Sequence, residues 1–441
     1  MDKVIENTDI RSNYRADFEV VSGLYGRGGR MNKLRQDAME FFEQSGFPTK
    51  KNEEWKYTDV SHIANTSFRY ETTSSNTNLS PEEINNFLIG GKDVQRLVFI
   101  NGHYNEQLSE IKDDKSIRLE TINENLKDEL VNNYFNSAID FRQDAFTALN
   151  SALAYDGAFV VISANAQIEK PIHIININDS RKEAIASHSR NLIIAEKGCK
   201  ASFILSYHSY NENNSGLTNA ATEIFCQPNS NVEVDIVQTE NEDNSQVNNL
   251  HVVQERDSVL SVSTISLSGR LIRNNLHVKL NGTNCETHLY GLYLASGNQL
   301  IDNHTFVDHA MPHCESNELY KGVAADKATA VFNGKVFVRP DAQKTNAFQE
   351  NKSILLSDDA NIYTKPQLEI YADDVKCSHG ATTGQLDEDA MFYLRSRGIG
   401  EDKARALLIN AFAQGVIDKI NIPVLRENRS RLIEQKLNKL S

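Results

Sequence analysis

The chain has 441 residues, of which 39% are hydrophobic and 24% are charged, a composition typical of a globular protein with a large core. Its 60 Asp and Glu residues outnumber its 46 Lys and Arg residues and leave a net charge of −14. This balance argues against nucleic-acid binding, which needs clustered positive charge. The longest apolar runs are far shorter than the ~20 residues that a membrane-spanning helix requires.

The cysteines predict a reduced, cytoplasmic protein. They are odd in number, widely spaced and contain no Cys-x-x-Cys pair, which is unlike a disulfide framework, a zinc ribbon or a ferredoxin-type cluster site. The first ten residues lack a basic stretch followed by an apolar one, so we expect no secretory signal. The five cysteines are Cys199, Cys226, Cys285, Cys314 and Cys377.

Residues 1–150 are expected to form a mixed, largely helical N-terminal domain. Three helices are predicted, over residues 31–43, from Pro81 onward, and across residues 146–153. In the first helix, apolar residues recur every three or four positions. The second has a serine at the N-cap, proline at the first position and acids in the first turn, all of which favour a helix start.

Residues 151–383 have a different pattern, in which short alternating apolar runs are separated by Asn, Asp, Ser and Gly. Period-two alternation indicates strands with one buried face, and the near absence of helices excludes a doubly wound α/β sheet. The runs begin at intervals of 26 to 43 residues, near Cys199, Asn231, Ser258, Asn284, Lys327 and Ala360.

This loose period is compatible with two architectures. One is a parallel β-helix whose coils carry loops of variable length. The other is a large β-sandwich or jelly roll. The asparagine-rich turns favour the β-helix slightly, because a corner that recurs in every coil selects side chains that tolerate left-handed backbone.

Residues 384–441 are expected to form a C-terminal helical domain with helices over 386–394, 401–420 and 424–440. In the second of these, apolar residues recur at helical spacing, and two acids near its start complement the helix dipole. No nucleotide-binding motif of the Walker A type is present in the sequence.

The densest group of soft metal ligands is His304, His309, His313 and Cys314. Imidazole and thiolate are the ligands that zinc and iron prefer. Gaps of five and four residues in a strand-and-turn context do not force these side chains together, so we expect structural or partner-facing histidines here rather than a preformed metal site.

Cys377 and His379 form a sharper pair. If the strand at residues 368–372 continues in extended form, residues 377 and 379 lie on the same face, so the thiol and the imidazole could reach one iron or one cluster edge. Two ligands are too few for a cluster, and the remainder would have to come from elsewhere. The alternative is a buried cysteine beside a hydrogen-bonded histidine at a domain junction.

Two segments, residues 368–382 and 392–399, resemble the C-terminal signature of the SufD branch of the SufB/SufD family of iron–sulfur cluster assembly proteins. The resemblance spans about residues 45–420. SufB proteins usually have Cys-Glu-His-Glu-Ala where this chain has Cys-Ser-His-Gly-Ala at 377–381, so Ser378 and Gly380 favour SufD. Further matching positions are Pro48, Glu54, Trp55-Lys-Tyr-Thr58, His304, His309, Pro312-His313, Tyr320-Lys321-Gly322, Asn333-Gly-Lys335 and 347–351.

The resemblance implies a right-handed parallel β-helix flanked by N-terminal and C-terminal helical domains. It also implies a non-catalytic scaffold subunit that pairs with SufB and binds the ATPase SufC, with sulfur supplied by a cysteine desulfurase system. His379, and with less weight Cys377, would contribute to a nascent cluster at the SufB–SufD interface. The chain alone would hold no cofactor tightly, and ATP would be bound by SufC.

Docking of SufC is expected on the C-terminal helical domain. The residues expected to take part are Tyr393, Arg395, Arg397, Leu407 and Phe412. Two other functions remain open from the sequence: a metal-binding homodimeric scaffold of the SufB type, and a β-helix enzyme that acts on carbohydrates.

Overall fold

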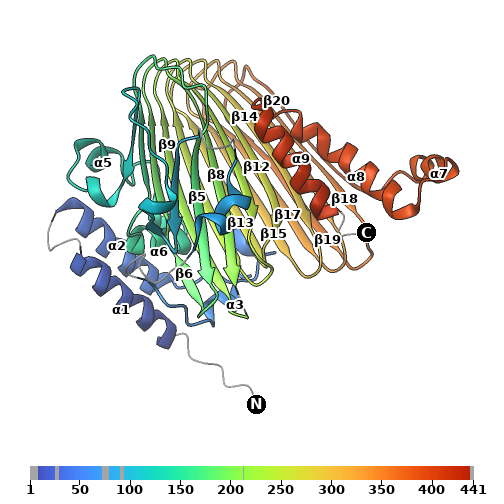
Figure 1. Cartoon of the computed structure of the whole chain (residues 1–441). Helices are drawn as coiled ribbons and strands as arrows, with labels where there is room; N and C mark the ends of the chain where they lie inside the picture. Colours follow the sequence, from blue (N-terminus) through green and yellow to red (C-terminus); the bar gives the residue numbers. More distant parts are fainter. Residues whose placement is uncertain (1–7, 25–28, 72–78, 90–93, 212, 438–441) are drawn as a thin grey trace.

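In the computed structural model of the chain, two long sheets wind about a common axis and helices from both ends of the sequence pack against them (Figure 1). Nearly all strand pairs in the two sheets are parallel, and consecutive strands from β7 onward alternate between the sheets. The β-helix with flanking helices is therefore confirmed, and the sandwich alternative is excluded. The structure describes residues 8–24, 29–71, 79–89, 94–211 and 213–437.

The first sheet has the strand order β2-β1-β5-β8-β10-β12-β14-β16-β18-β20. Its strands are β1 (Arg96–Ile100), β2 (His103–Tyr104), β5 (Ile172–Ser180), β8 (Lys200–Asn211), β10 (Asn231–Thr239), β12 (Val259–Ser268), β14 (Glu286–Ala295), β16 (Glu315–Ala324), β18 (Asn346–Leu355) and β20 (Lys376–Gly384).

The second sheet has the order β19-β17-β15-β13-β11-β9-β7-β4-β3, with β6 paired to β9 beside this path. Its strands are β3 (Ile117–Thr121), β4 (Ala158–Ile162), β6 (Ile185–Ser187), β7 (Arg190–Ala195), β9 (Gly216–Cys226), β11 (Ser245–Gln254), β13 (Leu271–Leu280), β15 (Leu300–His309), β17 (Thr329–Val338) and β19 (Asn361–Ile370).

One corner of the β-helix is built from residues in the left-handed backbone conformation. They lie at the same place in successive turns, and the backbone N–H of each donates to a carbonyl of the next turn, as from Asn229 to Arg256 at 2.9 Å and from His313 to Gln343 at 2.9 Å. This ladder accounts for the polar, asparagine-rich turns that favoured the β-helix. Its left-handed residues are Asn229, Asp257, Asn284, His313 and Lys344.

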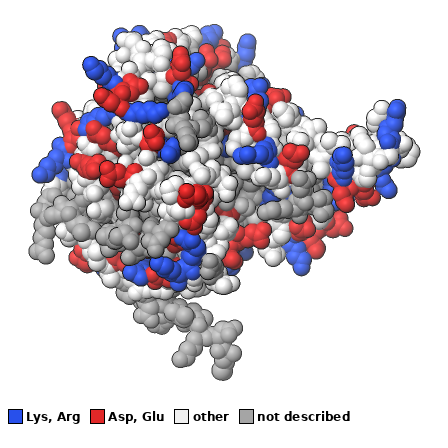
Figure 2. Space-filling model, in the orientation of Figure 1, with Lys and Arg blue, Asp and Glu red and all other residues white. Residues whose placement is uncertain are grey.

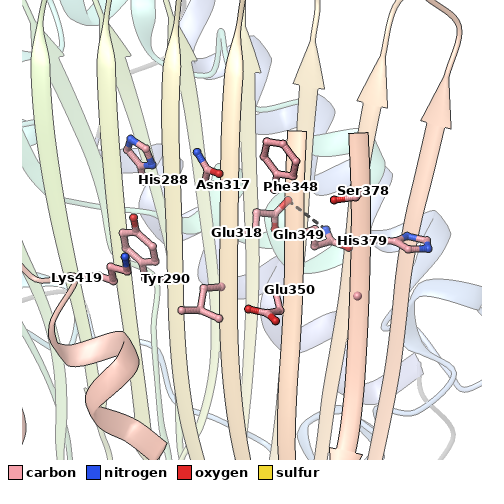
Figure 3. Close-up of a pocket in the computed structure, with 12 residues that line it drawn as sticks. His288, Tyr290, Asn317, Glu318, Phe348, Gln349, Glu350, Ser378, His379 and Lys419 are labelled. Atoms are coloured by element: carbon pink, nitrogen blue, oxygen red, sulfur yellow. Dashed lines mark hydrogen bonds between the residues drawn. The ribbon is translucent and has the colours of Figure 1, made fainter. Parts of the chain in front are cut away.

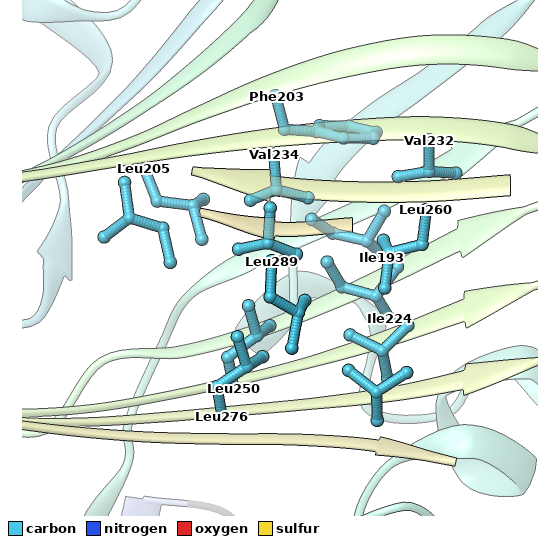
Figure 4. Close-up of a cluster of buried hydrophobic side chains, with 14 of the residues drawn as sticks. Ile193, Phe203, Leu205, Ile224, Val232, Val234, Leu250, Leu260, Leu276 and Leu289 are labelled. Carbon is cyan, nitrogen blue, oxygen red and sulfur yellow. The ribbon is translucent and has the colours of Figure 1, made fainter. Parts of the chain in front are cut away.

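The interior between the two sheets is filled by apolar side chains (Figure 4). Phe203, Val234 and Leu289 from the first sheet meet Ile224 and Leu250 from the second, and all five are buried. Because each strand contributes alternate residues to this interior, the period-two pattern of the sequence is explained directly.

The N-terminal part packs on the outside of the second sheet and also extends both sheets. Strands β1 and β3 come from residues 1–150, and they pair with β5 and β4. The remaining elements are helical: α1 (Thr8–Leu24), α2 (Arg30–Ser45), η1 (Glu53–Trp55), α3 (Ser61–Ala64), α4 (Pro81–Ile84), η3 (Asn85–Phe87), η4 (Glu106–Leu108), η5 (Asn123–Asn125), α5 (Glu129–Tyr134), η6 (Phe141–Gln143) and α6 (Ala145–Leu153).

The three expected C-terminal helices are present as α7 (Glu388–Ser396), α8 (Glu401–Ile417) and α9 (Pro423–Leu437). The last residues of the range expected for the third helix, 438–440, lie outside the described residues. Ile409 and Val416 of α8 and Ile433 of α9 pack on the first sheet. Within the described residues, no helix is long and apolar enough to cross a membrane.

Candidate functional site

The last two strands, β19 and β20, end the two sheets and have a strand partner on one side only among the described residues. Burial falls off here, and β20 has no fully buried residue. Nearby apolar side chains are exposed as well, including Tyr363, Ile370 and Tyr371. An end of this kind presents unpaired backbone N–H and C=O groups together with apolar surface.

Cys377 and His379 both lie on β20, at alternate positions of one extended strand, so they occupy the same face as the sequence predicted. The strand at residues 368–372 does not continue to them, because β19 ends at Ile370 and the chain turns into the other sheet before β20 begins at Lys376. Their neighbours in register on β18 are Ala347 and Gln349, whose side chains are buried inside the β-helix. Side chains at equivalent positions of successive turns form rows inside the β-helix. Cys377 and His379 are the last members of two such rows, at the open end.

The two side chains differ in environment. Cys377 is half-buried, and burial raises the pKa of its thiol. His379 is exposed, and Figure 3 shows its ring pointing away from β18, past the last strand. A cavity of about 620 Å³ lies beside it, with walls that include His288, Phe348 and Lys419.

Behind His379 lies a buried carboxyl group that sequence reasoning missed. Glu318 and Gln349 precede His379 in the same row, and Nε2 of Gln349 donates to Oε1 of Glu318 at 3.1 Å (Figure 3). The hydroxyl of Thr305 donates to the other carboxyl oxygen at 2.6 Å. Burial raises the pKa of Glu318 to about 7. The row was not visible in the sequence because its members are about thirty residues apart.

The described residues contain no group of three or more His, Cys, Asp and Glu side chains arranged to hold a metal ion. Cys377 and His379 therefore offer two ligands at most. The chemistry that this end of the β-helix supports is partial ligation of a soft or borderline metal such as iron, with the other ligands contributed by a different molecule.

The structure separates the histidines of residues 304–314. His304 lies on the outside of the second sheet, with its ring nitrogens 3.3 Å from a Glu54 carboxylate oxygen and 3.0 Å from one of Asp302. His309 is inside the β-helix, hydrogen-bonded to Ser316 at 2.9 Å, and burial lowers its pKa to about 3. His313 lies in the corner ladder. These three histidines do not form one metal site.

The segment around Trp55 lies on the second sheet and reaches its last strand. The ring of Tyr57 stacks on that of Tyr363 with centroids 4.1 Å apart. Nζ of Lys365 is 2.9 Å from a Glu53 carboxylate oxygen, and the guanidinium of Arg273 lies 4.5 Å from the Trp55 ring centroid. These contacts tie the N-terminal motif to β19 and so support the open end from outside.

The C-terminal helices carry the residues expected to dock a partner. None of the residues of α7 is buried, and Figure 1 shows this helix farthest from the sheets. Phe392 and Tyr393 are 74% and 57% exposed. Arg397 lies 5.2 Å from the Tyr393 ring centroid, and Arg395 is 3.4 Å from a Glu401 oxygen.

The two residues of α8 that are expected to bind a partner differ in exposure. Leu407 is exposed, whereas Phe412 is half-buried against the first sheet. Nζ of Lys321 donates to the Phe412 carbonyl at 2.8 Å and lies 4.8 Å from the centre of its ring. Figure 2 shows Lys and Arg interspersed with Asp and Glu over the visible face, including the projecting helices. The net negative charge does not collect in one acidic patch on that face.

The fold defines a β-helix protein with helical domains at both ends and an open edge that carries a thiol and an imidazole. The sequence matches the family model "SUF system FeS cluster assembly, SufBD core domain" over residues 176–412 and "SufBD protein N-terminal region" over residues 25–174. The chain therefore belongs to the SufBD family of iron–sulfur cluster assembly proteins.

Individual relatives agree with this assignment. An iron–sulfur cluster assembly SufBD family protein of Synechocystis is 33% identical over 402 residues, which cover 89% of this chain and 88% of the relative. The iron–sulfur cluster assembly protein SufD of Escherichia coli is 29% identical, with 93% and 94% covered. The SufD protein of Bacillus subtilis is 28% identical, with 70% and 71% covered.

Proposed function

We propose that this chain is a non-catalytic scaffold subunit of a Suf complex, of the SufD type, and that it supplies part of the site where a cluster is assembled. The observation that carries the proposal is the position of Cys377 and His379 on β20, which pairs with β18 on one side and has no second strand partner among the described residues. Iron and sulfide are the cargo of this site, and no resident cofactor is needed in this chain.

The remaining ligands would come from a second scaffold subunit of the SufB type that covers the open end. Unpaired strand edges are common sites of strand addition, in which backbone hydrogen bonds provide affinity and side-chain pockets provide specificity. The exposed side chains of Tyr363, Ile370 and Tyr371 would be buried in such a pairing. A second copy of this chain is the competing occupant of the same edge.

The C-terminal helices would bind the ATPase SufC. The exposed aromatic side chains of Phe392 and Tyr393 are suited to anchor a protein interface, because aromatic residues are enriched among those that contribute most to binding energy. ATP would be bound by SufC. Closure of two SufC copies on ATP would pull on α7 and α8 and so shift the packing between the two scaffold subunits.

The site is tested by reconstituting the complex with the variants His379→Ala and Cys377→Ser and measuring cluster formation by its visible absorption. We expect His379→Ala to reduce cluster formation to background and Cys377→Ser to reduce it less, while the subunits still co-purify. Ser378→Ala is the matched control, because Ser378 points to the opposite face of the same strand. Normal cluster formation by His379→Ala would refute the site.

ATPase docking has its own test. The double variant Phe392→Ser and Tyr393→Ser should lose co-purification with SufC, yet keep its melting temperature because neither side chain is buried. Val20→Ser is the control, since it removes an exposed apolar side chain on α1. Retained binding by the double variant would show that the ATPase docks elsewhere.

A further inference from the structure

A cavity of about 360 Å³ lies between the outer face of the second sheet and the N-terminal segments η1, η6 and α6. This volume is within the range of sites that bind small molecules. The sheet side of the cavity includes side chains of β11, β13, β15 and β17, whereas Cys377 and His379 lie on the first sheet and are not among its walls. The cavity is therefore separate from the proposed assembly site.

Aromatic rings line the sheet side of this cavity. His251, His277 and Phe306 occupy neighbouring register positions on β11, β13 and β15. The rings of the two histidines stack with centroids 4.5 Å apart, and the Phe306 centroid is 5.6 Å from that of His277. Burial lowers the pKa of His277 to about 4 and that of His251 well below its usual value, so both imidazoles are uncharged at neutral pH.

The faces of the rings on the walls are already in use. Because His251 and His277 stack on each other, they present mainly their edges to the cavity. On the opposite wall the ring of Trp55 stacks on that of Phe146 at 5.3 Å, and the guanidinium of Arg273 lies 4.5 Å from its centroid. Aromatic edges carry partial positive charge and attract the face of another aromatic ring. A ligand that suits these walls therefore brings a flat aromatic ring of its own, whereas a sugar would need an open ring face to lie on.

Two buried polar atoms on the walls have no hydrogen-bond partner among the described residues, namely Nδ2 of Asn249 and Oδ1 of Asp144. The other oxygen of each side chain is engaged. Oδ1 of Asn249 accepts from Asn275 at 2.8 Å, and Oδ2 of Asp144 accepts from the backbone N–H of Thr147 at 3.0 Å. Buried polar groups without a partner are costly. A ligand that accepts from Asn249 and donates to Asp144 would satisfy both.

The charges on the walls disfavour an anionic ligand. Arg273 forms a buried ion pair with Asp302, and Nζ of Lys335 is 2.7 Å from a carboxylate oxygen of Glu369. The carboxyl group of Asp140 also lines the cavity. A phosphate group would therefore meet negative charge, and both cations that line this part of the described chain already have a counter-charge.

The row of three rings sets the size of the ligand. It covers two strand intervals, roughly 10 Å, which is the length of a fused two-ring system with its van der Waals envelope. We propose that this cavity binds an uncharged purine, as the free base or the nucleoside, with its ring over the edges of His251 and His277 and its polar edge at Asn249 and Asp144. Adenine has its amino donor beside the N7 acceptor, and guanine has its N1–H donor beside the O6 acceptor.

Trp55 is the single tryptophan of the chain and is part of the wall, so its fluorescence reports whether the cavity is occupied. The test titrates the unmodified full-length chain with adenosine and with guanosine, with excitation where purines do not absorb, and calorimetry gives the stoichiometry and Kd. We expect one equivalent of at least one of these nucleosides to bind with a micromolar Kd. Cytidine, which has a single ring, and the corresponding 5′-monophosphate should each bind about tenfold more weakly.

Three variants test the walls. His277→Leu removes a ring edge, Asn249→Asp removes the free donor and keeps the oxygen that is already bonded, and Asp144→Asn keeps an N-cap side chain for α6 but replaces a carboxyl oxygen by an amide N–H2 group. Each should weaken binding by about tenfold. His62→Leu is the matched control and should bind normally, because His62 is another half-buried histidine beside the second sheet but does not line the cavity.

Absence of binding by both purine nucleosides up to about 1 mM would overturn the proposal. Binding of glucose in their place, equal affinity for cytidine, or unchanged affinity in all three wall variants would each overturn it as well. The ligand series is measured on the unmodified chain, so it decides the matter even where a variant does not fold.

Discussion

Arg429 of α9 and Asp235 of β10 form an ion pair that is buried where the C-terminal helices pack on the first sheet. The side chains are 0% and 2% exposed, and both Nε and Nη2 of Arg429 donate to the same oxygen of Asp235, the former at 2.9 Å. A buried charge pair contributes little net stability, but removal of one partner leaves the other charge uncompensated. Loss of one partner alone is therefore expected to weaken the packing of α9 on the first sheet.

We expect Arg429→Met to destabilise the chain by about 3–5 kcal/mol. The cause is the isolated carboxylate of Asp235, so the double variant Arg429→Met and Asp235→Leu should recover most of the loss. Urea unfolding followed by circular dichroism measures both. Arg431→Met, which changes an exposed arginine of the same helix, should have little effect. Equal destabilisation by the single and double variants would contradict this explanation.

The buried carboxyl of Glu318 predicts a pH dependence. Burial raises its pKa to about 7, so the folded chain holds this proton more tightly than the unfolded chain does. As the pH rises from about 4.5 to 7, the unfolded state loses its proton first and the free energy of unfolding falls, by roughly 3 kcal/mol in total. Above pH 7 Glu318 is ionised in both states, and the free energy of unfolding does not regain this amount.

Glu318→Gln removes the titration and keeps two hydrogen-bonding atoms. We therefore expect the stability of this variant relative to the unmodified chain to increase between pH 5 and pH 8, as measured by urea unfolding at several pH values. Glu286→Gln changes an exposed glutamate and should show no such trend. A difference that is independent of pH would mean that Glu318 is ionised throughout.

Thiol labelling should single out Cys377. It is half-buried, whereas the other four cysteines are buried in the native state. Because burial raises the pKa of its thiol, labelling by iodoacetamide should be slow at pH 7 and should accelerate roughly tenfold per pH unit toward pH 9. Mass spectrometry of digested protein identifies the modified residue. Labelling of a second cysteine at a similar rate would show that the corner ladder opens under native conditions.

Gly322 lies against the ring of Tyr293 on the neighbouring strand. A Cβ at this glycine would lie 2.0 Å from a ring carbon, and the Tyr293 hydroxyl is fixed by a hydrogen bond from Asn351 at 3.0 Å. We expect Gly322→Ala to cost about 1–3 kcal/mol in thermal or urea unfolding. Gly384→Ala, where nothing lies within 4 Å of an added Cβ, is the control. Equal stability of the two variants would refute this packing argument.

Whether a segment forms a helix or a strand could be predicted from the sequence, because apolar residues recur every three or four positions in a helix and every second position in a strand. Residues 31–43, 146–153 and 401–420 were predicted as helices and appear as α2, α6 and α8 with small differences at their ends. Six strand starts were also located, those of β8, β10, β12, β14, β17 and β19, but the strands between them and the sheet to which each belongs were not. Both sheets bury alternate residues, so alternation cannot distinguish them.

That ambiguity explains the irregular intervals between predicted strands. The positions near Asn231, Ser258 and Asn284 mark strands of the first sheet, whereas those near Lys327 and Ala360 mark β17 and β19 of the second. Within the first sheet alone, β10 to β20 begin 27 to 31 residues apart. The interval of 43 residues arose from the change of sheet.

The candidate site was predictable only in part for a related reason. The spacing of Cys377 and His379 places both on one face of a strand, and this required no knowledge of the fold. Their position at an open edge, and their alignment with Gln349 and Glu318, depend on how many turns precede them and on the register between turns. Those quantities are set by the corner ladder and not by any local pattern.

The unfinished end of the β-helix has a consequence for how the protein is made. In the part of the chain that the structure describes, β19 and β20 each have one edge without a strand partner, and the rings of Tyr363 and Tyr371 are exposed near these edges, so this end of the protein is prone to self-association. If this chain is synthesised in excess over the partner that covers this surface, the uncovered molecules are expected to associate with one another. A cell would therefore benefit from producing this chain and its capping partner together and in matched amounts.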